Sequence, residues 1–71
     1  MIEVQAEMTA SVWKVEVAVG QTVAADDDLV ILESMKMEIP VAAPEAGTVT
    51  AIHVAAGDQV TEGQALVSIS S

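Results

Sequence analysis

A single lysine set between two methionines near the middle of the chain is the group best suited to chemistry in this sequence. Lys36 lies in the segment Glu33–Glu38, which reads Glu-Ser-Met-Lys-Met-Glu. A lysine amine can act as a nucleophile in covalent chemistry. The sequence offers no Ser/His/Asp set, phosphate-binding loop or paired-carboxylate cleft from which an active site could be built around it. We therefore interpret Lys36 as a point of covalent attachment and not as a catalytic amine.

The composition limits what can hold this lysine in place. A chain of 71 residues forms one small domain that buries only about 60% of its unfolded surface. Valine and isoleucine supply much of the apolar content, and Trp13 is the single aromatic residue. Branched aliphatic side chains favour strands over helices. We therefore expect an all-β fold in which residues 1–71 make up a single domain.

The charge excludes several classes of partner. Eleven acidic residues against Lys14 and Lys36 give a net charge of −9, which argues against nucleic acid and against anionic membranes. The acids would keep an apolar-rich domain monomeric, and a second interpretation is that they steer it toward basic enzyme surfaces. The chain has no cysteine, no signal-peptide pattern and no apolar run near the ~20 residues of a membrane span. We expect a cytoplasmic monomer.

An internal repeat divides the chain into halves of about residues 1–37 and 38–71. Shifting the sequence by 37 positions aligns the halves without a gap and matches Ile2 with Ile39, Val4 with Val41, Ala6 with Ala43, Val12 with Val49, Val17 with Val54, Gly20 with Gly57, Val23 with Val60, Leu29 with Leu66, Val30 with Val67 and Ser34 with Ser71. Halves of this length cannot each bury a core, so they must pack on each other, most simply about a pseudo-twofold axis. Such an axis would place Lys36 and the chain termini at opposite ends.

Alternation of apolar and polar residues predicts strands within each half. In the first half, the residues expected to face the core are Trp13, Val15, Val17 and Val19. The pattern recurs after the repeat shift, and turn residues interrupt it at similar intervals. We expect about four short strands per half.

The residues around Lys36 predict a hairpin with a defined register. If Met35 and Lys36 form a two-residue turn, the facing pairs are Ser34 with Met37, Glu33 with Glu38, Leu32 with Ile39, and Val30 with Val41. This register places the aliphatic residues on one face and the acids on the other. Tight hairpin turns favour Asn-Gly and similar pairs, so Met-Lys is an unfavourable choice. A sequence that breaks a local rule at a well-defined turn often does so for function.

The segment Glu33–Glu38 resembles the attachment signature of biotinyl domains, which usually reads Glu-Ala-Met-Lys-Met, with Ser34 in place of the alanine. The phrases Gly-x-x-Val from Gly20 and Gly-x-x-Val-x-x-Gly-x-x-Leu from Gly57 are similar to the same biotinyl/lipoyl carrier family. The resemblance covers nearly the whole chain. It implies a flattened β-barrel of two four-stranded antiparallel sheets with internal pseudo-twofold symmetry and the modified lysine at a hairpin tip.

The resemblance also implies a function. Lys36 would be acylated by a biotin protein ligase, its amine attacking the carbonyl of an activated biotinyl adenylate. The attached biotin would carry carboxylate between a biotin carboxylase and a carboxyltransferase, while the domain itself performs no catalysis. Met35 and Met37 would serve as recognition elements, because flexible thioethers adapt to more than one surface. The remaining residues of the motif are Glu33, Ser34 and Glu38.

Two further departures from the family pattern, besides Ser34, fall in the first half. Ala10 stands where the family usually has glycine, and its repeat partner Gly47 keeps that glycine. Asp28 stands near the place where a Gly-Gln pair usually precedes Leu29, whereas Gly63-Gln64 keeps that pair in the second half. The turns of the first half are therefore expected to be stiffer or displaced.

Other functions remain open. A lipoyl carrier would share the fold, but lipoyl sites usually have an aspartate before the lysine and lack the Met-Lys-Met arrangement. A non-carrier interaction module would leave Lys36 unmodified. We expect no metal site, because Asp26–Asp28 lacks the spaced oxygen ligands of a calcium loop and His53 has no second histidine or cysteine to join it. His53 is expected to be structural.

Overall fold

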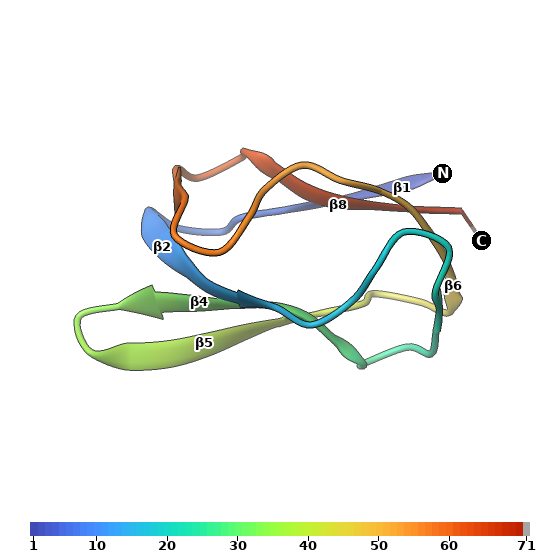
Figure 1. The fold of residues 1–71 in the computed structure, drawn as a ribbon, viewed down its shortest axis with the longest axis horizontal. Helices are drawn as coiled ribbons and strands as arrows, with labels where there is room; N and C mark the ends of the chain where they lie inside the picture. The colour runs from blue at the N-terminus through green and yellow to red at the C-terminus, as the bar shows by residue number, and fades with distance from the viewer. Residues whose placement is uncertain (71) are drawn as a thin grey trace.

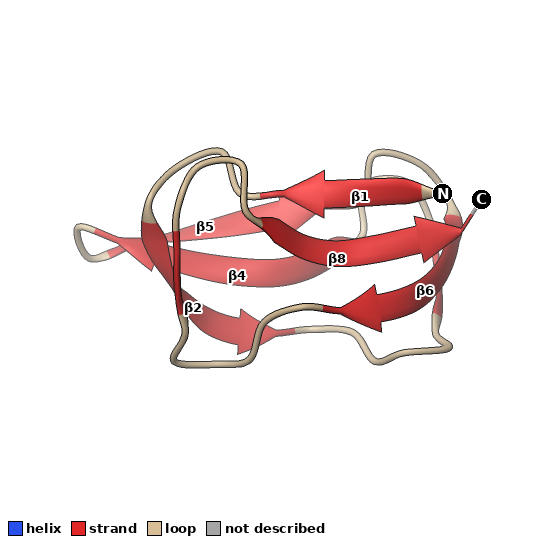
Figure 2. Ribbon diagram, turned by 90° about the horizontal axis from the view of Figure 1, so that it is seen from above, coloured by secondary structure: helices blue, strands red, loops and turns tan. Residues whose placement is uncertain are grey.

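The computed structural model describes residues 1–70, and its regular elements are strands (Figures 1 and 2). In chain order these are β1 (Ile2–Gln5), β2 (Ala10–Val15), β3 (Thr22–Val23), β4 (Asp28–Ser34), β5 (Met37–Ala42), β6 (Gly47–Ile52), β7 (Gln59–Val60) and β8 (Ala65–Ser70). No helix that could cross a membrane occurs within residues 1–70. The molecule is elongated, with principal extents of 32 × 17 × 17 Å.

The eight strands form two four-stranded antiparallel sheets. One has the order β1-β8-β6-β3 and is called the β1 sheet; the other has the order β5-β4-β2-β7 and is called the β5 sheet. Adding 37 to the bounds of β2 gives the bounds of β6, and the same shift converts β3 into β7. Exchanging each strand for its counterpart four places along the chain turns one sheet order into the other. The expected all-β class, with two sheets and four strands from each half, is confirmed.

Four tight turns are closed by side chains at equivalent positions of the two halves. In each turn a side-chain oxygen accepts a hydrogen bond from the backbone N–H three residues earlier, which satisfies a donor that the turn would otherwise leave exposed. The pairs are Gln21 with Ala18 at 3.2 Å, Asp58 with Ala55 at 2.9 Å, Asp27 with Ala24 at 2.9 Å and Gln64 with Thr61 at 3.2 Å. Asp27 thus makes in the first half the hydrogen bond that Gln64 makes in the second. The expected displacement of the first-half turn is wrong.

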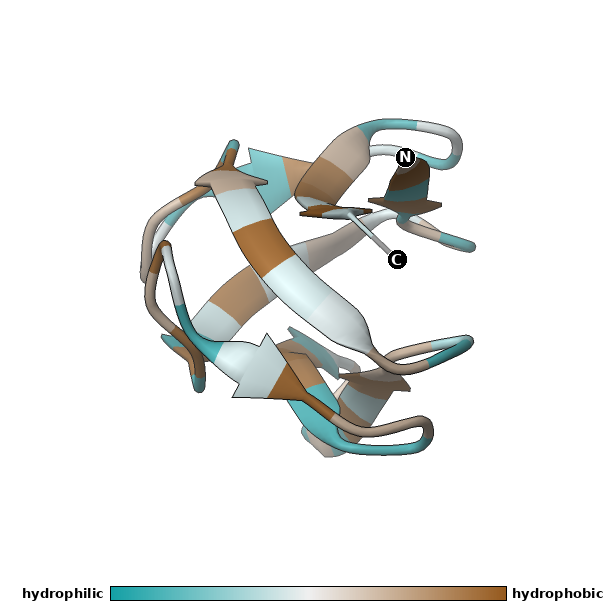
Figure 3. Ribbon diagram, turned by 90° about the vertical axis from the view of Figure 1, so that its right-hand side faces the viewer, coloured by the Kyte–Doolittle hydropathy of each residue, from teal (hydrophilic) through white to brown (hydrophobic). Residues whose placement is uncertain are grey.

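The core lies between the two sheets and is aliphatic. Viewed along the long axis, apolar and polar residues alternate along the strands (Figure 3). The largest of the fully buried side chains are Leu29, Leu32, Leu66, Ile69, Val12, Val23, Val30, Val49, Val60 and Val67. These residues come from both halves, so the apolar side chains of each half are covered by those of the other.

Trp13 was expected to face the core, and this prediction is wrong. Val12 lies opposite Leu32 and Lys14 lies opposite Ile31, so Trp13 is the extra residue of a β-bulge. The bulge interrupts the alternation, and the Trp13 side chain is 48% exposed. Val19 is also exposed, because β2 ends at Val15 and the chain then leaves the sheet for a turn.

Candidate functional site at the β4–β5 hairpin

The strands β4 and β5 meet in a two-residue turn made by Met35 and Lys36. Both residues have positive φ, 52° for Met35 and 64° for Lys36. Positive φ at both central residues is what a tight hairpin requires, because only that twist matches the twist of the flanking strands. The turn is therefore formed by two side chains that adopt this conformation unfavourably, as the sequence predicted.

The predicted register of the hairpin is confirmed in every pair. Ser34 lies opposite Met37, Glu33 opposite Glu38, Leu32 opposite Ile39 and Val30 opposite Val41. Leu32 and Val30 are buried, whereas Glu33 and Glu38 are exposed. The aliphatic pairs hold the base of the hairpin against the core, and the carboxylates lie on its outer face.

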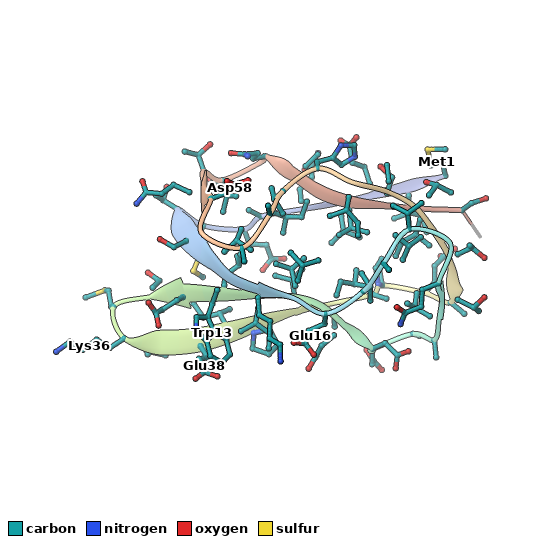
Figure 4. The ribbon with its side chains drawn as sticks, in the orientation of Figure 1. Met1, Trp13, Glu16, Lys36, Glu38 and Asp58 are labelled. Atoms are coloured by element: carbon teal, nitrogen blue, oxygen red, sulfur yellow. The ribbon has the colours of Figure 1, made fainter. Side chains whose placement is uncertain are left out.

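Lys36 stands at the tip of the molecule, at the end away from Met1 (Figure 4). Its side chain is exposed, and its Nζ forms no ion pair or hydrogen bond with residues 1–70. On either side of it, the side chain of Met35 is 92% exposed and that of Met37 is 64% exposed. The amine is therefore open to an enzyme that approaches along the long axis, and that enzyme would meet two thioethers beside it.

The remaining lysine is held differently. Lys14 lies on β2, and its Nζ is 3.3 Å from Oε1 of Glu16. It projects from the side of a strand, with no turn to carry it away from the body of the domain. Of the two lysines, only Lys36 combines a projecting backbone with an unpaired amine among the described residues.

His53 forms a hydrogen bond with Ser68, outside the β4–β5 hairpin. Its Nε2 shares a hydrogen bond of 2.9 Å with Oγ of Ser68, which is only 6% exposed. This bond satisfies a buried hydroxyl, so His53 has the structural role expected of it. Within residues 1–70 no three side chains of the types His, Cys, Asp and Glu are grouped so that they could hold a metal ion.

Trp13 is one of two surface residues, with Val19, that the sequence pattern placed wrongly. A signal was nevertheless present in the repeat, because the 37-residue shift places Trp13 over the polar Thr50. In β6, Val49 lies opposite Ile69 and Ala51 lies opposite Ser68, so Thr50 is also an extra residue in a bulge. A position that accepts threonine in one half is an unsuitable place for a core tryptophan in the other.

Comparison with known proteins shows the family to which the chain belongs. Residues 2–69 match the Biotin_lipoyl family, whose description is "Biotin-requiring enzyme". The chain belongs to this family. Among its relatives is the biotinylated protein TB7.3 homolog of Mycobacterium leprae, which is 47% identical over 68 residues that cover 96% of each chain. The resemblance based on Glu33–Glu38 and the glycine phrases is confirmed.

Other proteins similar to this chain are longer, and the similarity covers only part of each. The biotin carboxyl carrier protein of Streptococcus mutans is 48% identical over 65 residues, which cover 92% of this chain and 50% of that protein. The crystal structure of the Kluyveromyces lactis urea carboxylase superimposes with a TM-score of 0.91 and 36% identity over 97% of this chain, but over only 6% of that enzyme. The similarity is therefore limited to one segment of each longer protein, about as long as this chain, and to the fold of that segment.

The hairpin fits the group that the family name implies. Biotin has a carboxyl group through which an amide can form with a lysine amine, so the site needs an accessible amine that stands clear of the domain. Lys36 meets this requirement because its Nζ is unpaired among residues 1–70 and its backbone lies at the molecular tip. A biotin carrier role follows from the family and from the relatives that share it.

Proposed function

We propose that biotin is covalently attached to Nζ of Lys36, and that residues 1–71 form a single carrier domain with no catalytic activity of its own. The observation that carries this proposal is the position of the amine at the hairpin tip. Lys14 does not compete as the acceptor, because it lies along a strand and is paired with Glu16.

The domain would work by presenting Lys36 to several partners in turn. When bound, biotin supplies a ureido nitrogen that takes up and gives up carboxylate. The chain contributes a rigid hairpin whose base is fixed by buried Leu32, together with exposed methionines for recognition. Tethering replaces a dilute cofactor by a high local concentration at each enzyme. The proposed partners are a biotin protein ligase, a biotin carboxylase and a carboxyltransferase, met by a monomer in the cytoplasm.

Intact-mass spectrometry tests the proposal. The chain is produced with an active biotin protein ligase and biotin, alongside the variants Lys36→Arg and Lys14→Arg. We expect one biotinyl group on the unaltered chain and on Lys14→Arg, and none on Lys36→Arg. Modification that persists in Lys36→Arg would overturn the assignment of the residue. Modification of Lys36 by a lipoyl ligase, with no biotinylation, would identify the chain as a lipoyl carrier.

A further inference from the structure

Three apolar side chains cross the outer face of the β5 sheet beside the hairpin. Ile31 on β4 lies opposite Pro40 on β5 and opposite Lys14 on β2, and Trp13 is the bulge residue that precedes Lys14. Trp13 and Pro40 are exposed and Ile31 is half-buried, whereas the alternate residues of β4 face the core. We call Trp13, Ile31 and Pro40 the tryptophan strip. Along the long axis, Trp13 lies between the Lys36 tip and Glu16 (Figure 4).

Two carboxylates border this strip on the side of the hairpin tip. Glu33 and Glu38 are directly opposite each other, and both side chains are exposed. Like charges that face each other across antiparallel strands destabilise a sheet. No cation among residues 1–70 compensates them, because Lys14 is paired with Glu16 and Lys36 forms no ion pair. The matching positive charge would have to come from another molecule.

We propose that the tryptophan strip is the docking surface for the enzyme that acylates Lys36, and that this enzyme places an arginine against Glu33 and Glu38. This inference rests on the proposed function. Tryptophan and arginine are the residues most enriched among those that dominate binding energy in protein interfaces. A guanidinium can bind a carboxylate through two hydrogen bonds and can stack on an aromatic face, so it matches both parts of this surface.

The short length of the Lys36 side chain favours the acylating enzyme as the protein that binds the tryptophan strip. The extended side chain carries Nζ only about 6 Å from the backbone, so an enzyme that acts on this amine must bring its own surface against the hairpin. The pair Ile31–Pro40 lies three residue pairs from Ser34–Met37, about 10 Å along the strands. A protein interface of ordinary size covers about 800 Å² on each partner, roughly 30 Å across, and would include the strip.

A second copy of the chain fits this surface poorly. Each copy carries a net charge of −9 and would bring its own Glu33 and Glu38 to the same contact. These carboxylates would repel each other where the interface needs a cation. Charge complementarity therefore selects a basic protein surface.

Steady-state biotinylation of the full chain by a biotin protein ligase tests the docking surface. The variant Trp13→Thr removes the anchor while keeping a residue that the equivalent bulge already contains at Thr50. We expect the KM for the carrier to rise about tenfold or more with kcat within about twofold, as for loss of an interface anchor worth at least about 1.4 kcal/mol. The control Val19→Thr changes another exposed apolar residue, which lies outside the strip, and should keep the KM of the unaltered chain.

Failure of this proposal is distinguishable from failure of the proposed function. If the unaltered chain is biotinylated on Lys36 and Trp13→Thr keeps its KM, the carrier assignment stands and the docking surface is wrong. If the unaltered chain is never biotinylated, the proposed function itself is wrong, and the docking proposal fails with it. For the arginine contact, Glu33→Gln/Glu38→Gln should raise KM and reduce its dependence on salt, and an unchanged salt dependence would contradict it.

Fluorine NMR provides a readout that needs no substitution in the strip. Trp13 is the only tryptophan, so a chain labelled with 5-fluorotryptophan gives a single protein resonance. In the variant Lys36→Arg, which cannot be acylated, this resonance should shift or broaden when unlabelled ligase is added. A resonance that stays unchanged at saturating ligase would overturn the proposal. A shift that depends on the concentration of the carrier alone would assign the strip to self-association and would also overturn it.

Discussion

The backbone of Gly47 lies against the side chain of Ile69 at the start of β6. A Cβ built on Gly47 would be 2.5 Å from Cγ2 of Ile69 and 2.6 Å from the carbonyl oxygen of Ser70. In the first half, the equivalent residue is Ala10, and the counterpart of Ile69 is Leu32. The departure from the family pattern at Ala10 is therefore tolerated in one half, whereas the other half has no room for the same methyl group.

Gly47→Ala should consequently destabilise the domain by about 1–3 kcal/mol, because the added methyl group overpacks a closed contact with backbone on one side. Urea denaturation followed by far-ultraviolet circular dichroism measures the change. The reciprocal variant Ala10→Gly serves as the control and should lose less than about 1 kcal/mol. Equal stability of Gly47→Ala and the unaltered chain would show that this contact can open freely.

Asp26 occupies a backbone conformation that suits glycine better. Its φ is 73°, and its repeat partner Gly63 has a φ of 87°. A side chain other than glycine in this conformation loses about 1–2 kcal/mol, and somewhat less for aspartate. Asp26→Gly should therefore raise the free energy of unfolding by about 0.5–1 kcal/mol. Thermal unfolding tests this, with Gly63→Asp as the matched variant that should lose a similar amount.

The Glu33–Glu38 pair should reduce stability in a salt-dependent way. Replacing Glu38 by glutamine removes the repulsion and should stabilise the domain by about 0.2–1 kcal/mol at low ionic strength. At about 1 M salt the gain should largely disappear, because exposed charges are then screened over about 3 Å. Urea denaturation at two salt concentrations measures both values. A gain that persists unchanged in high salt would point to packing instead of charge.

The exposed methionines should matter for recognition and not for folding. Met35→Leu and Met37→Leu change exposed side chains, so each should alter the free energy of unfolding by less than about 0.5 kcal/mol. The rate at which the biotinylated chain is carboxylated should fall, because leucine adapts less well than a thioether to different surfaces. Carboxylation at the rate of the unaltered chain would remove the methionines from partner recognition.

The hairpin was predictable from sequence because two constraints agree there. A two-residue turn at Met35-Lys36 leaves one register, and that register also places Leu32 and Ile39 together on the face that packs against the core. A shift by one residue would bring the acids into the core, so hydrophobic burial excludes it. The internal repeat likewise made the strands predictable, since each strand of one half predicts its counterpart in the other.

Trp13 was not predictable from alternation because a bulge adds one residue to a single strand. Residues before the extra position follow one phase, and residues after it follow the other, so counting by twos across the bulge places Trp13 on the wrong face. The prediction of a displaced turn in the first half was wrong for a different reason. Asp26 adopts the conformation of its partner Gly63 despite its side chain, because Asp27 closes the turn with the hydrogen bond that Gln64 makes in the second half.

Lys36 and Met1 lie at opposite ends of the long axis (Figure 4), and β8 ends beside the start of β1, so the domain can act as a lever. A segment that continued from either end would act as a pivot, with 32 Å of rigid protein between it and the acceptor lysine. The lysine–biotin arm would add about 14 Å. Rotation about such a pivot could sweep the reactive ring through an arc with a diameter on the order of 90 Å, set mostly by the folded domain and only in smaller part by the flexible arm.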